Sequence, residues 1–250
     1  MNISLIIIII FILITFLLGQ YYQKHYDIKA IKEYIQNTEN ERNTAMNGID
    51  SKYYINFAFH YRLFNLFEIV TKKLDEKNIS YFLIGGGLIG YFRHNQGFIP
   101  WDDDIDIGVM EEDRNKLHDA INEIIKDNDY ILLMKYCNYD IDKVLNGKFN
   151  DNPIQIDIFY FKYFPNKKYY NFNSNITQFT WPNQYIYTDE LFPLKTINYI
   201  LYDIYGNKFK EINIKIPNQS KIYLDRVYNK WELIKKPSHS HSKYNKIIFS

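Results

Sequence analysis

The segment Phe98–Ile107 places four carboxylates within five residues of an otherwise apolar stretch. It reads Phe-Ile-Pro-Trp-Asp-Asp-Asp-Ile-Asp-Ile, with the acids at Asp102, Asp103, Asp104 and Asp106. These like charges repel one another, and the segment contains no basic residue to offset them. A bound cation would relieve the repulsion, and an all-oxygen ligand set suits Mg²⁺ or Mn²⁺ rather than zinc. The segment therefore predicts a divalent metal site that handles phosphate.

Strand geometry narrows the set of metal ligands. Side chains alternate along a strand, so Asp104 and Asp106 lie on one face, and Asp103 is expected to point away. Asp102 has the same parity as Asp104 but precedes the strand. Asp157 stands in a second apolar run, where the neighbouring isoleucines form the opposite face. If the two strands are neighbours, Asp104, Asp106 and Asp157 form a three-carboxylate site suited to metal-assisted phosphoryl transfer.

A glycine turn precedes the acidic strand. Gly85–Gly87 follows a predicted strand, Tyr81–Ile84, and precedes a short predicted helix, Leu88–Asn95. Backbone N–H groups at such a turn can approach phosphate closely, and the helix N-terminus adds partial positive charge. Arg93 lies about two turns along the helix and is a candidate for the same phosphate. A structural salt bridge is the alternative role for Arg93.

A calcium-binding EF-hand is a specific alternative for the acidic segment. Asp102, Asp104 and Asp106 match the first, third and fifth ligand positions of its loop. Ile107 stands where the loop requires glycine, and Asp113 stands where it requires a bidentate glutamate. The pattern therefore excludes an EF-hand. A solvated acidic surface is the simpler alternative, and the apolar neighbours of the acids argue against it.

The N-terminus predicts a membrane anchor. Ile3–Leu18 carries no charge and is slightly shorter than the roughly 20 residues of a spanning helix. We expect a transmembrane signal anchor at 1–19, a polar stem or linker at 20–50 and a globular catalytic domain at 51–250. A cleaved signal peptide is the alternative, although the usual positive n-region is missing.

Composition removes several classes of function. The formal net charge of +1 provides no global field for nucleic acid, so we expect no nucleic-acid partner. The single cysteine, Cys137, excludes an internal disulfide and a multi-cysteine zinc site. His239 and His241 form a short tract that can bind metal, with a flexible tail as the alternative.

The pattern of elements predicts a mixed α/β sheet flanked by helices. The apolar periodicity indicates helices at 53–75, 88–95, 111–127 and 220–233, and strands at 81–84, 104–110, 130–134 and 154–161. Beyond Pro165 it indicates only aromatic-rich loops and short elements.

The glycine turn and the acidic segments together resemble the signature of a known family. Tyr81–Gly90, Arg93 and Gly97–Ile107 together resemble the signature of the LicD family, which includes bacterial phosphocholine transferases and fukutin-related proteins. Ile156–Phe159 resembles the second acidic strand of the family, and Tyr228–Trp231 resembles its C-terminal segment, with asparagine where glycine is usual. The resemblance covers residues 57–237.

The resemblance implies a nucleotidyltransferase-like fold and a metal-dependent reaction. Family members transfer a phosphorylated alcohol, such as phosphocholine or ribitol phosphate, from a CDP-activated donor to a hydroxyl of a glycan or glycoconjugate. Carried over, Asp104 and Asp106 would bind Mg²⁺ or Mn²⁺, with Asp102 as an auxiliary ligand. Asp157 would be the third carboxylate and a base for the acceptor. Gly85–Gly87 would position the donor diphosphate, and Arg93 would neutralise its charge.

Location and two other functions stay open. The lysines at 24, 29 and 32 favour a cytosolic domain on a single-pass membrane protein, whereas eukaryotic relatives imply an ER or Golgi lumenal domain, as would hold for a eukaryotic or viral chain. A nucleotide-sugar glycosyltransferase also uses paired aspartates, but the glycine turn argues against it. An inactive membrane-tethered adaptor on the same scaffold is the non-enzymatic alternative.

Overall fold

A computed structural model describes residues 55, 57–127, 131–135, 141–146, 154–172, 185–203, 205–228 and 230–233. The predicted anchor and stem, the cysteine at 137 and the two-histidine tract lie outside these residues. Among the helices of the described part, none is both long and apolar enough to cross a membrane.

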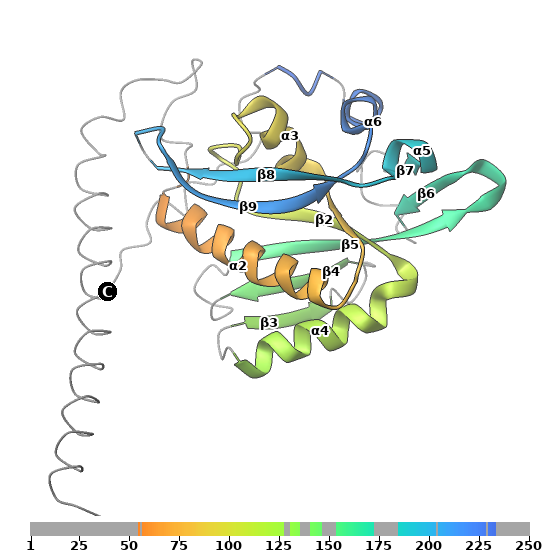
Figure 1. Ribbon diagram of the computed structural model, residues 1–250, viewed down its shortest axis with the longest axis horizontal. Coiled ribbons are helices and arrows are strands. Elements are labelled where there is room, and N and C mark those ends of the chain that lie inside the picture. Colours follow the sequence, from red (N-terminus) through yellow and green to blue (C-terminus); the bar gives the residue numbers. More distant parts are fainter. Residues whose placement is uncertain are drawn as a thin grey trace, which may run out of the picture. The chain divides into compact units, whose positions relative to one another are not determined.

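The described chain forms a mixed sheet with helices around it (Figure 1). The elements are, in chain order, α2 (Phe57–Glu76), β1 (Tyr81–Leu83), α3 (Gly85–Arg93), β2 (Asp104–Met110), η3 (Glu111–Asp113), α4 (Arg114–Asp127), β3 (Ile131–Lys135), β4 (Ile141–Asn146), β5 (Ile154–Phe164), η4 (Pro165–Lys167), β6 (Tyr169–Phe172), β7 (Tyr185–Tyr187), α5 (Thr188–Leu191), β8 (Lys195–Tyr202), β9 (Lys208–Ile216) and α6 (Ser220–Val227).

The strand order of the sheet is β1-β2-β5-β4-β3, and β6 and β7 extend it from the far end of β5. β2 and β5 run parallel, whereas β1, β3, β4, β6 and β7 pair in antiparallel fashion. β8 and β9 form a separate hairpin. The predicted mixed α/β fold is confirmed.

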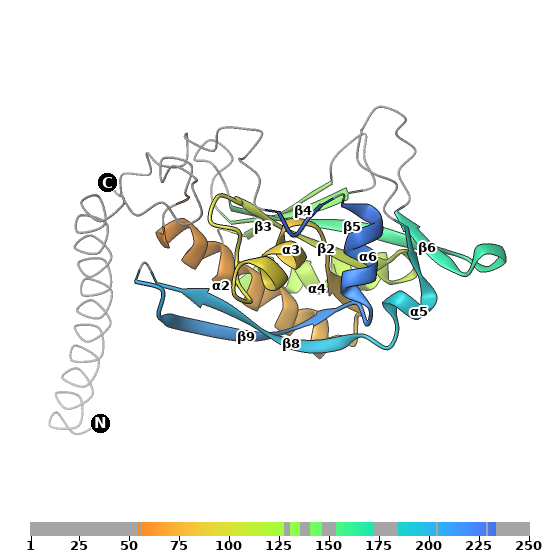
Figure 2. The same cartoon turned by 90° about the horizontal axis from the view of Figure 1, so that it is seen from above.

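One face of the sheet carries the core. Alternation along β2 and β5 places the isoleucines at 105, 107, 156 and 158 on this face, and all four are fully buried. Helices α2 and α4 cover it, and Figure 2 shows both on the same side of the strands. Their own apolar stripes supply the other half of the core. The opposite face of β2 and β5 carries Asp104, Asp106 and Asp157 at one end and the buried Phe159 and Phe161 at the other.

A buried polar cluster fastens α4 to the core face. Asp142 of β4 accepts a hydrogen bond of 2.5 Å from the Tyr160 hydroxyl, and its Oδ2 lies 2.5 Å from Nε2 of His118. The Asp142 side chain is buried, so both contacts replace water that the carboxylate has lost. The cluster therefore fixes α4 against β4 and β5.

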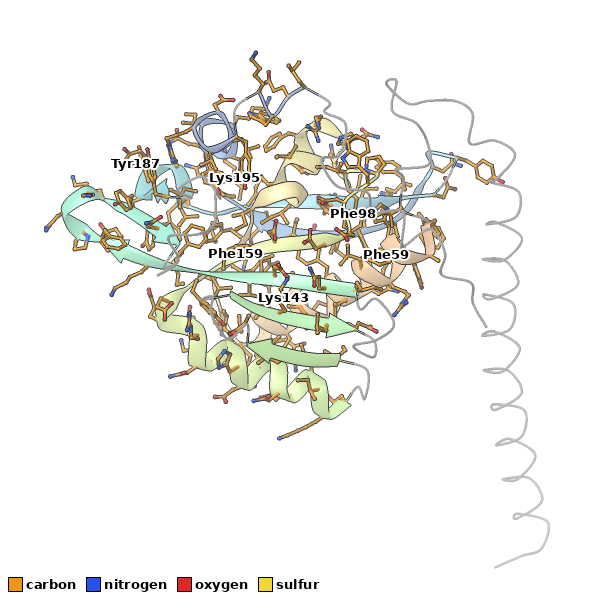
Figure 3. All side chains as sticks on the ribbon, turned by 180° about the vertical axis from the view of Figure 1, so that it is seen from behind. Phe59, Phe98, Lys143, Phe159, Tyr187 and Lys195 are labelled. Carbon is orange, nitrogen blue, oxygen red and sulfur yellow. The ribbon has the colours of Figure 1, made fainter. Side chains whose placement is uncertain are left out.

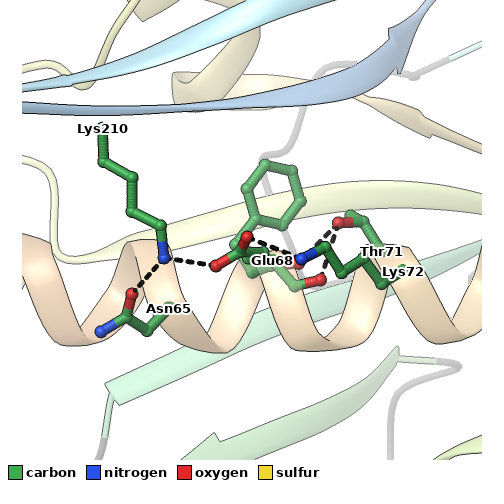
Figure 4. A network of polar contacts seen from close by, with 6 residues as sticks. Asn65, Glu68, Thr71, Lys72 and Lys210 are labelled. Carbon is green, nitrogen blue, oxygen red and sulfur yellow. Dashed lines mark hydrogen bonds and ion pairs between the residues drawn. The ribbon is translucent and has the colours of Figure 1, made fainter.

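The β8–β9 hairpin is held against α2 by polar contacts (Figure 4). Lys210 of β9 donates a hydrogen bond of 2.9 Å to the Asn65 side chain and pairs with Glu68. Lys72 binds the other oxygen of Glu68 at 2.9 Å. Such partly exposed pairs contribute little individually, so the hairpin depends mainly on its buried residues, among them Tyr199.

An ion pair with a buried carboxylate fixes α6. Arg226 pairs with the buried Glu190 of α5, and its Nη1 donates a hydrogen bond of 2.7 Å to the Tyr185 carbonyl. Removing one partner of a buried pair leaves an uncompensated charge, so this contact determines where α6 lies.

Several boundaries differ from the sequence-based expectations. α3 begins at Gly85 rather than 88, because the glycines form the first turn of the helix instead of a separate loop. The last helix ends at Val227 rather than 233. Strand β4 and strands β6 to β9 were not predicted. Most of these runs are short and aromatic-rich, whereas β9 does alternate, with Ile212, Ile214 and Ile216 on its buried face.

Gly108→Ala is expected to destabilise the sheet by about 1–3 kcal/mol, the usual cost of overpacking. A Cβ at Gly108 would lie 2.4 Å from the Phe82 ring, which packs across the paired strand. Urea unfolding of the full chain measures the effect. Phe82→Leu makes room, so the double variant should lose less stability than the sum of the single variants, and simple additivity would contradict this account.

Candidate metal and phosphate site

Two parallel strands bring three carboxylates together on the face of the sheet opposite α2 and α4. In the β2–β5 register, Asp106 lies opposite Asp157, and Asp104 lies opposite Gln155. One carboxylate oxygen from each of Asp104, Asp106 and Asp157 lies within 4.8 Å of the other two. The strands are therefore neighbours, as the three-carboxylate prediction requires.

Burial and mutual repulsion disfavour the ionised forms of these three acids. Asp106 is 7% exposed and Asp157 is 8% exposed. Burial, followed by the charges of Asp157 and Asp103, raises the pKa of Asp104 to about 7. Burial and the neighbouring acids also raise the pKa of Asp106 well above its usual value. The isolated carboxylates therefore bind protons near neutral pH, and a divalent cation would compete with those protons.

Asp102 and Asp103 extend the group toward the loop before β2. Together with Asp104 they place one oxygen each within 4.8 Å of one another. Asp103 was expected to point away, but it precedes the first strand residue, so strand parity does not apply to it. Burial, then Asp104 and Asp103, raise the pKa of Asp102. Asp102 therefore lies where an auxiliary ligand is expected.

The glycines bring the start of α3 against these acids. A Cβ at Gly85, where φ is +58°, would lie 2.1 Å from Oδ2 of Asp106. A Cβ at Gly86 would lie 2.0 Å from Oδ2 of Asp102, and one at Gly87 would lie 2.7 Å from the Leu83 side chain. Only glycine permits the approach at the first two positions. The partial positive charge of the helix end thus lies beside the carboxylates, where an anionic donor would also be attracted.

Arg93 makes hydrogen bonds within the protein, and its expected role toward the phosphate stays a prediction. Its Nη1 donates hydrogen bonds of 2.8 Å to the Trp231 carbonyl and 3.0 Å to the Leu233 carbonyl, and its Nε donates to His94. These contacts tie α3 to the C-terminal segment. Burial and the neighbouring acids raise the pKa of Asp102, and the Arg93 guanidinium opposes part of this rise. Its described role is structural, with an electrostatic influence on the site.

Lys143 joins the site from β4 and was missed by the sequence reasoning. It lies opposite Asp157 in the β4–β5 register, and its Nζ is 2.8 Å from Oδ1 and 2.6 Å from Oδ2 of Asp157. Figure 3 labels this side chain, seen from the side opposite to Figure 1. The available signal was one lysine in a run whose other alternating positions are apolar, and it was not recognised because β4 itself was not predicted.

A buried tyrosine from α6 completes the described surroundings. The Tyr223 side chain is fully buried, and its hydroxyl has no hydrogen-bond partner among the described residues. Burial raises the pKa of this hydroxyl, Arg226 opposes the shift, and the charge of Asp106 adds to it. Tyr223 therefore experiences the field of the acidic group.

The residues fit a hard divalent cation. All ligand candidates are carboxylate oxygens, they are close enough to share an ion, and they repel one another in its absence. Asp104, Asp106 and Asp157 are the main candidates, with Asp102 beside them. The identity of the ion and the predicted use of the glycines on a diphosphate stay predictions.

A family model agrees with the resemblance found in the sequence. The model described as LicD/FKTN/FKRP, nucleotidyltransferase domain, matches residues 78–219, which is more than half of the chain. These residues include the glycines, the acidic strand β2, its neighbours β1 and β5, and β4, which pairs with β5.

Individual relatives match this chain at low identity or over a short segment. An uncharacterized protein of Rickettsia prowazekii is 27% identical over 72% of this chain and 59% of its own length. The lipopolysaccharide cholinephosphotransferase LicD of Haemophilus influenzae is 41% identical over 22% of this chain and 21% of its own length. The chain thus spans less than two thirds of these curated relatives.

Among solved structures, a lincosamide antibiotic adenylyltransferase with lincomycin bound aligns with a TM-score of 0.40 and 11% identity. The alignment covers 73% of this chain and 91% of that chain. A likeness at this level carries no conclusion about fold or substrate.

Gly85→Ala is expected to weaken divalent-cation binding by more than about tenfold, because the new Cβ displaces the Asp106 carboxylate from the group. Gly206→Ala is the matched control: Gly206 also has positive φ, at +80°, but a Cβ there meets nothing within 4 Å. Calorimetric titration with Mn²⁺ measures the cation affinity, and urea unfolding measures any loss of stability. Equal cation affinities in the two variants would contradict the packing argument.

Stability should depend on pH through Asp104. Its folded-state pKa of about 7 exceeds the unfolded value of about 3.9, so the folded state binds more protons between these limits. The contribution of protonated Asp104 to the free energy of unfolding is therefore complete below about pH 4 and is lost as the pH rises through about 7. Thermal unfolding in a chelator should show wild type losing more stability than Asp104→Asn from about pH 5 to about pH 8. Saturating Mg²⁺ should remove the difference in slope, and parallel pH profiles in the chelator would contradict the assignment.

Proposed function

The chain belongs to the family described as LicD/FKTN/FKRP, nucleotidyltransferase domain, and we propose that it transfers a phosphorylated alcohol from a CDP-activated donor to a glycan hydroxyl with Mg²⁺ or Mn²⁺. The observation that carries the proposal is the buried three-carboxylate group beside the N-terminus of α3. Oxygen ligands next to a helix N-terminus are suited to a metal–diphosphate complex.

The alcohol and acceptor classes in this proposal come from a relative. The Haemophilus influenzae protein carries the name of a lipopolysaccharide cholinephosphotransferase, which favours a phosphocholine-like group and a glycan or glycoconjugate acceptor. Ribitol phosphate and glycerol phosphate have the same phosphodiester chemistry and are equally compatible with the carboxylates.

Each site residue has a role in this proposal. Asp104 and Asp106 hold the metal, Asp102 assists them, and Asp157 serves as third carboxylate and as base for the acceptor. When bound, the metal supplies charge neutralisation on the phosphate oxygens and orients the departing group. Gly85–Gly87 presents backbone N–H groups and the positive end of α3 to the donor diphosphate.

The reaction is a substitution at phosphorus. The acceptor hydroxyl oxygen forms a bond to the phosphorus that carries the alcohol, and the bond from that phosphorus to the bridging oxygen breaks. CMP leaves with the electron pair of that bond. Asp157 takes the hydroxyl proton as general base.

We also retain the membrane-anchor prediction for 1–19 as part of the proposal. A glycan or lipid-linked acceptor at a membrane surface would place substrate and enzyme together. The uncharged apolar sequence of this segment supports the anchor, and its length makes a spanning helix feasible with short interfacial extensions.

The test is a donor screen with the full chain in detergent. CDP-choline, CDP-ribitol and CDP-glycerol are supplied with Mn²⁺ or Mg²⁺, and CMP release and donor binding are measured. One donor should bind and turn over, a chelator should abolish turnover, and Asp104→Asn and Asp106→Asn should each lose more than about 100-fold. Glu112→Gln, an exposed acid of η3, is the matched control and should retain activity.

The screen also separates the alternatives. A UDP-sugar that binds and turns over while every CDP-alcohol fails would identify a glycosyltransferase instead. Normal folding without Mn²⁺ affinity would indicate an inactive adaptor. Equal activity of wild type and Asp104→Asn would overturn the proposed role of the carboxylate group.

A further inference from the structure

Lys143 brings a positive charge into the carboxylate group. Its side chain is 16% exposed and that of Asp157 is 11% exposed, and its ammonium contacts both oxygens of Asp157. Asp157 in turn lies opposite Asp106 in the parallel register. The ammonium therefore occupies one side of the group to which a divalent cation is expected to bind.

The position of the Lys143 ammonium affects how strongly the carboxylates can bind a divalent cation. The other described cation near the acids, Arg93, donates its hydrogen bonds to His94 and to two backbone carbonyls. Lys143, by contrast, contacts a carboxylate and lowers the pKa of Asp104, Asp106 and Asp157 against the larger effect of burial. An ammonium and a divalent cation close together repel each other, and both attract the same carboxylate.

The chemistry of lysine allows the competition to be resolved by movement. The ammonium sits at the end of a flexible four-carbon stem, so it can shift by several ångströms while the β4–β5 backbone pairing stays intact. A donor diphosphate would bring negative charge to the acidic group and offer the ammonium a new partner. Lysine is well suited to this as a compact charge for phosphate.

We propose that Lys143 is a positioning residue that neutralises Asp157 in the free protein, releases it when the divalent metal binds, and then binds the donor diphosphate. This inference rests on the proposed function for the identity of the donor. It assigns Lys143 two opposing effects, namely weaker metal binding in the free protein and stronger binding of a diphosphate. A lysine that only stabilises the fold would not produce opposing effects.

The experiment compares Lys143→Met with wild type in two titrations. Mn²⁺ is titrated without any phosphate ligand at about pH 8.5, above the raised pKa of Asp104, so that protons compete little. Removal of the repelling ammonium should tighten Mn²⁺ binding by about tenfold or more. Inorganic pyrophosphate is then titrated at saturating Mn²⁺, and its affinity should fall by about tenfold or more.

Three further variants control the measurement. Lys143→Arg keeps the charge, so it should not tighten Mn²⁺ binding as Lys143→Met does. Lys210→Met removes a lysine that pairs with Glu68 away from the carboxylate group and should change neither affinity. Lys143→Gln repeats the test with a polar side chain if Lys143→Met does not unfold cooperatively.

The outcomes distinguish this inference from the proposed function. Opposite shifts for Mn²⁺ and pyrophosphate support the role of Lys143 even if no CDP-alcohol turns over, in which case only the proposed donor fails. Affinities that are unchanged, or that both weaken along with the unfolding temperature, overturn the inference and leave a structural ion pair. Turnover of a CDP-alcohol with wild-type kinetics in Lys143→Met would overturn it while supporting the proposed function.

Discussion

The parallel pairing of β2 with β5 places buried carboxylates against one another, and much of the described structure adapts to that repulsion. The register puts Asp106 opposite Asp157, while the core face of the same strands is closed by α2 and α4. Water has little access to screen the charges, so the pKa values of these acids rise. A group of this kind is tolerated when it has cations or positive dipoles to bind.

Two neighbouring elements provide such compensation. The N-terminus of α3 reaches the acids because Gly85 and Gly86 have no Cβ to collide with Asp106 and Asp102. The β4 strand supplies Lys143, whose ammonium contacts both oxygens of Asp157. The remaining excess of negative charge is the reason for proposing a divalent cation, and the adjacent helix N-terminus is the reason for proposing a diphosphate ligand. Family membership and the site's chemistry thus favour the same class of reaction.

The elements that the sequence predicted correctly are those with strong local periodicity, and the ones it missed depend on contacts between distant segments. Helices α2 and α4 and strands β2 and β5 have strong apolar periodicity, so local sequence indicated them. The hairpin of β8 and β9 was not predicted, although isoleucines alternate along β9. Its position depends on buried contacts with α2, which lies more than 100 residues away in the sequence. The contacts of Arg93 were not predicted for a similar reason, since its carbonyl partners at 231 and 233 are distant in sequence.

The sequence by itself determined that Asp104 and Asp106 share a face, that isoleucines occupy the other face and that glycines precede the acidic strand. These features depend on local alternation and spacing, which the backbone geometry of a strand enforces. Only the tertiary structure decided that β5 is the neighbour of β2, that Lys143 meets Asp157 and that α3 approaches Asp106. Strand order and register depend on pairing and packing between segments about 50 residues apart, and local periodicity holds no information about which segments meet.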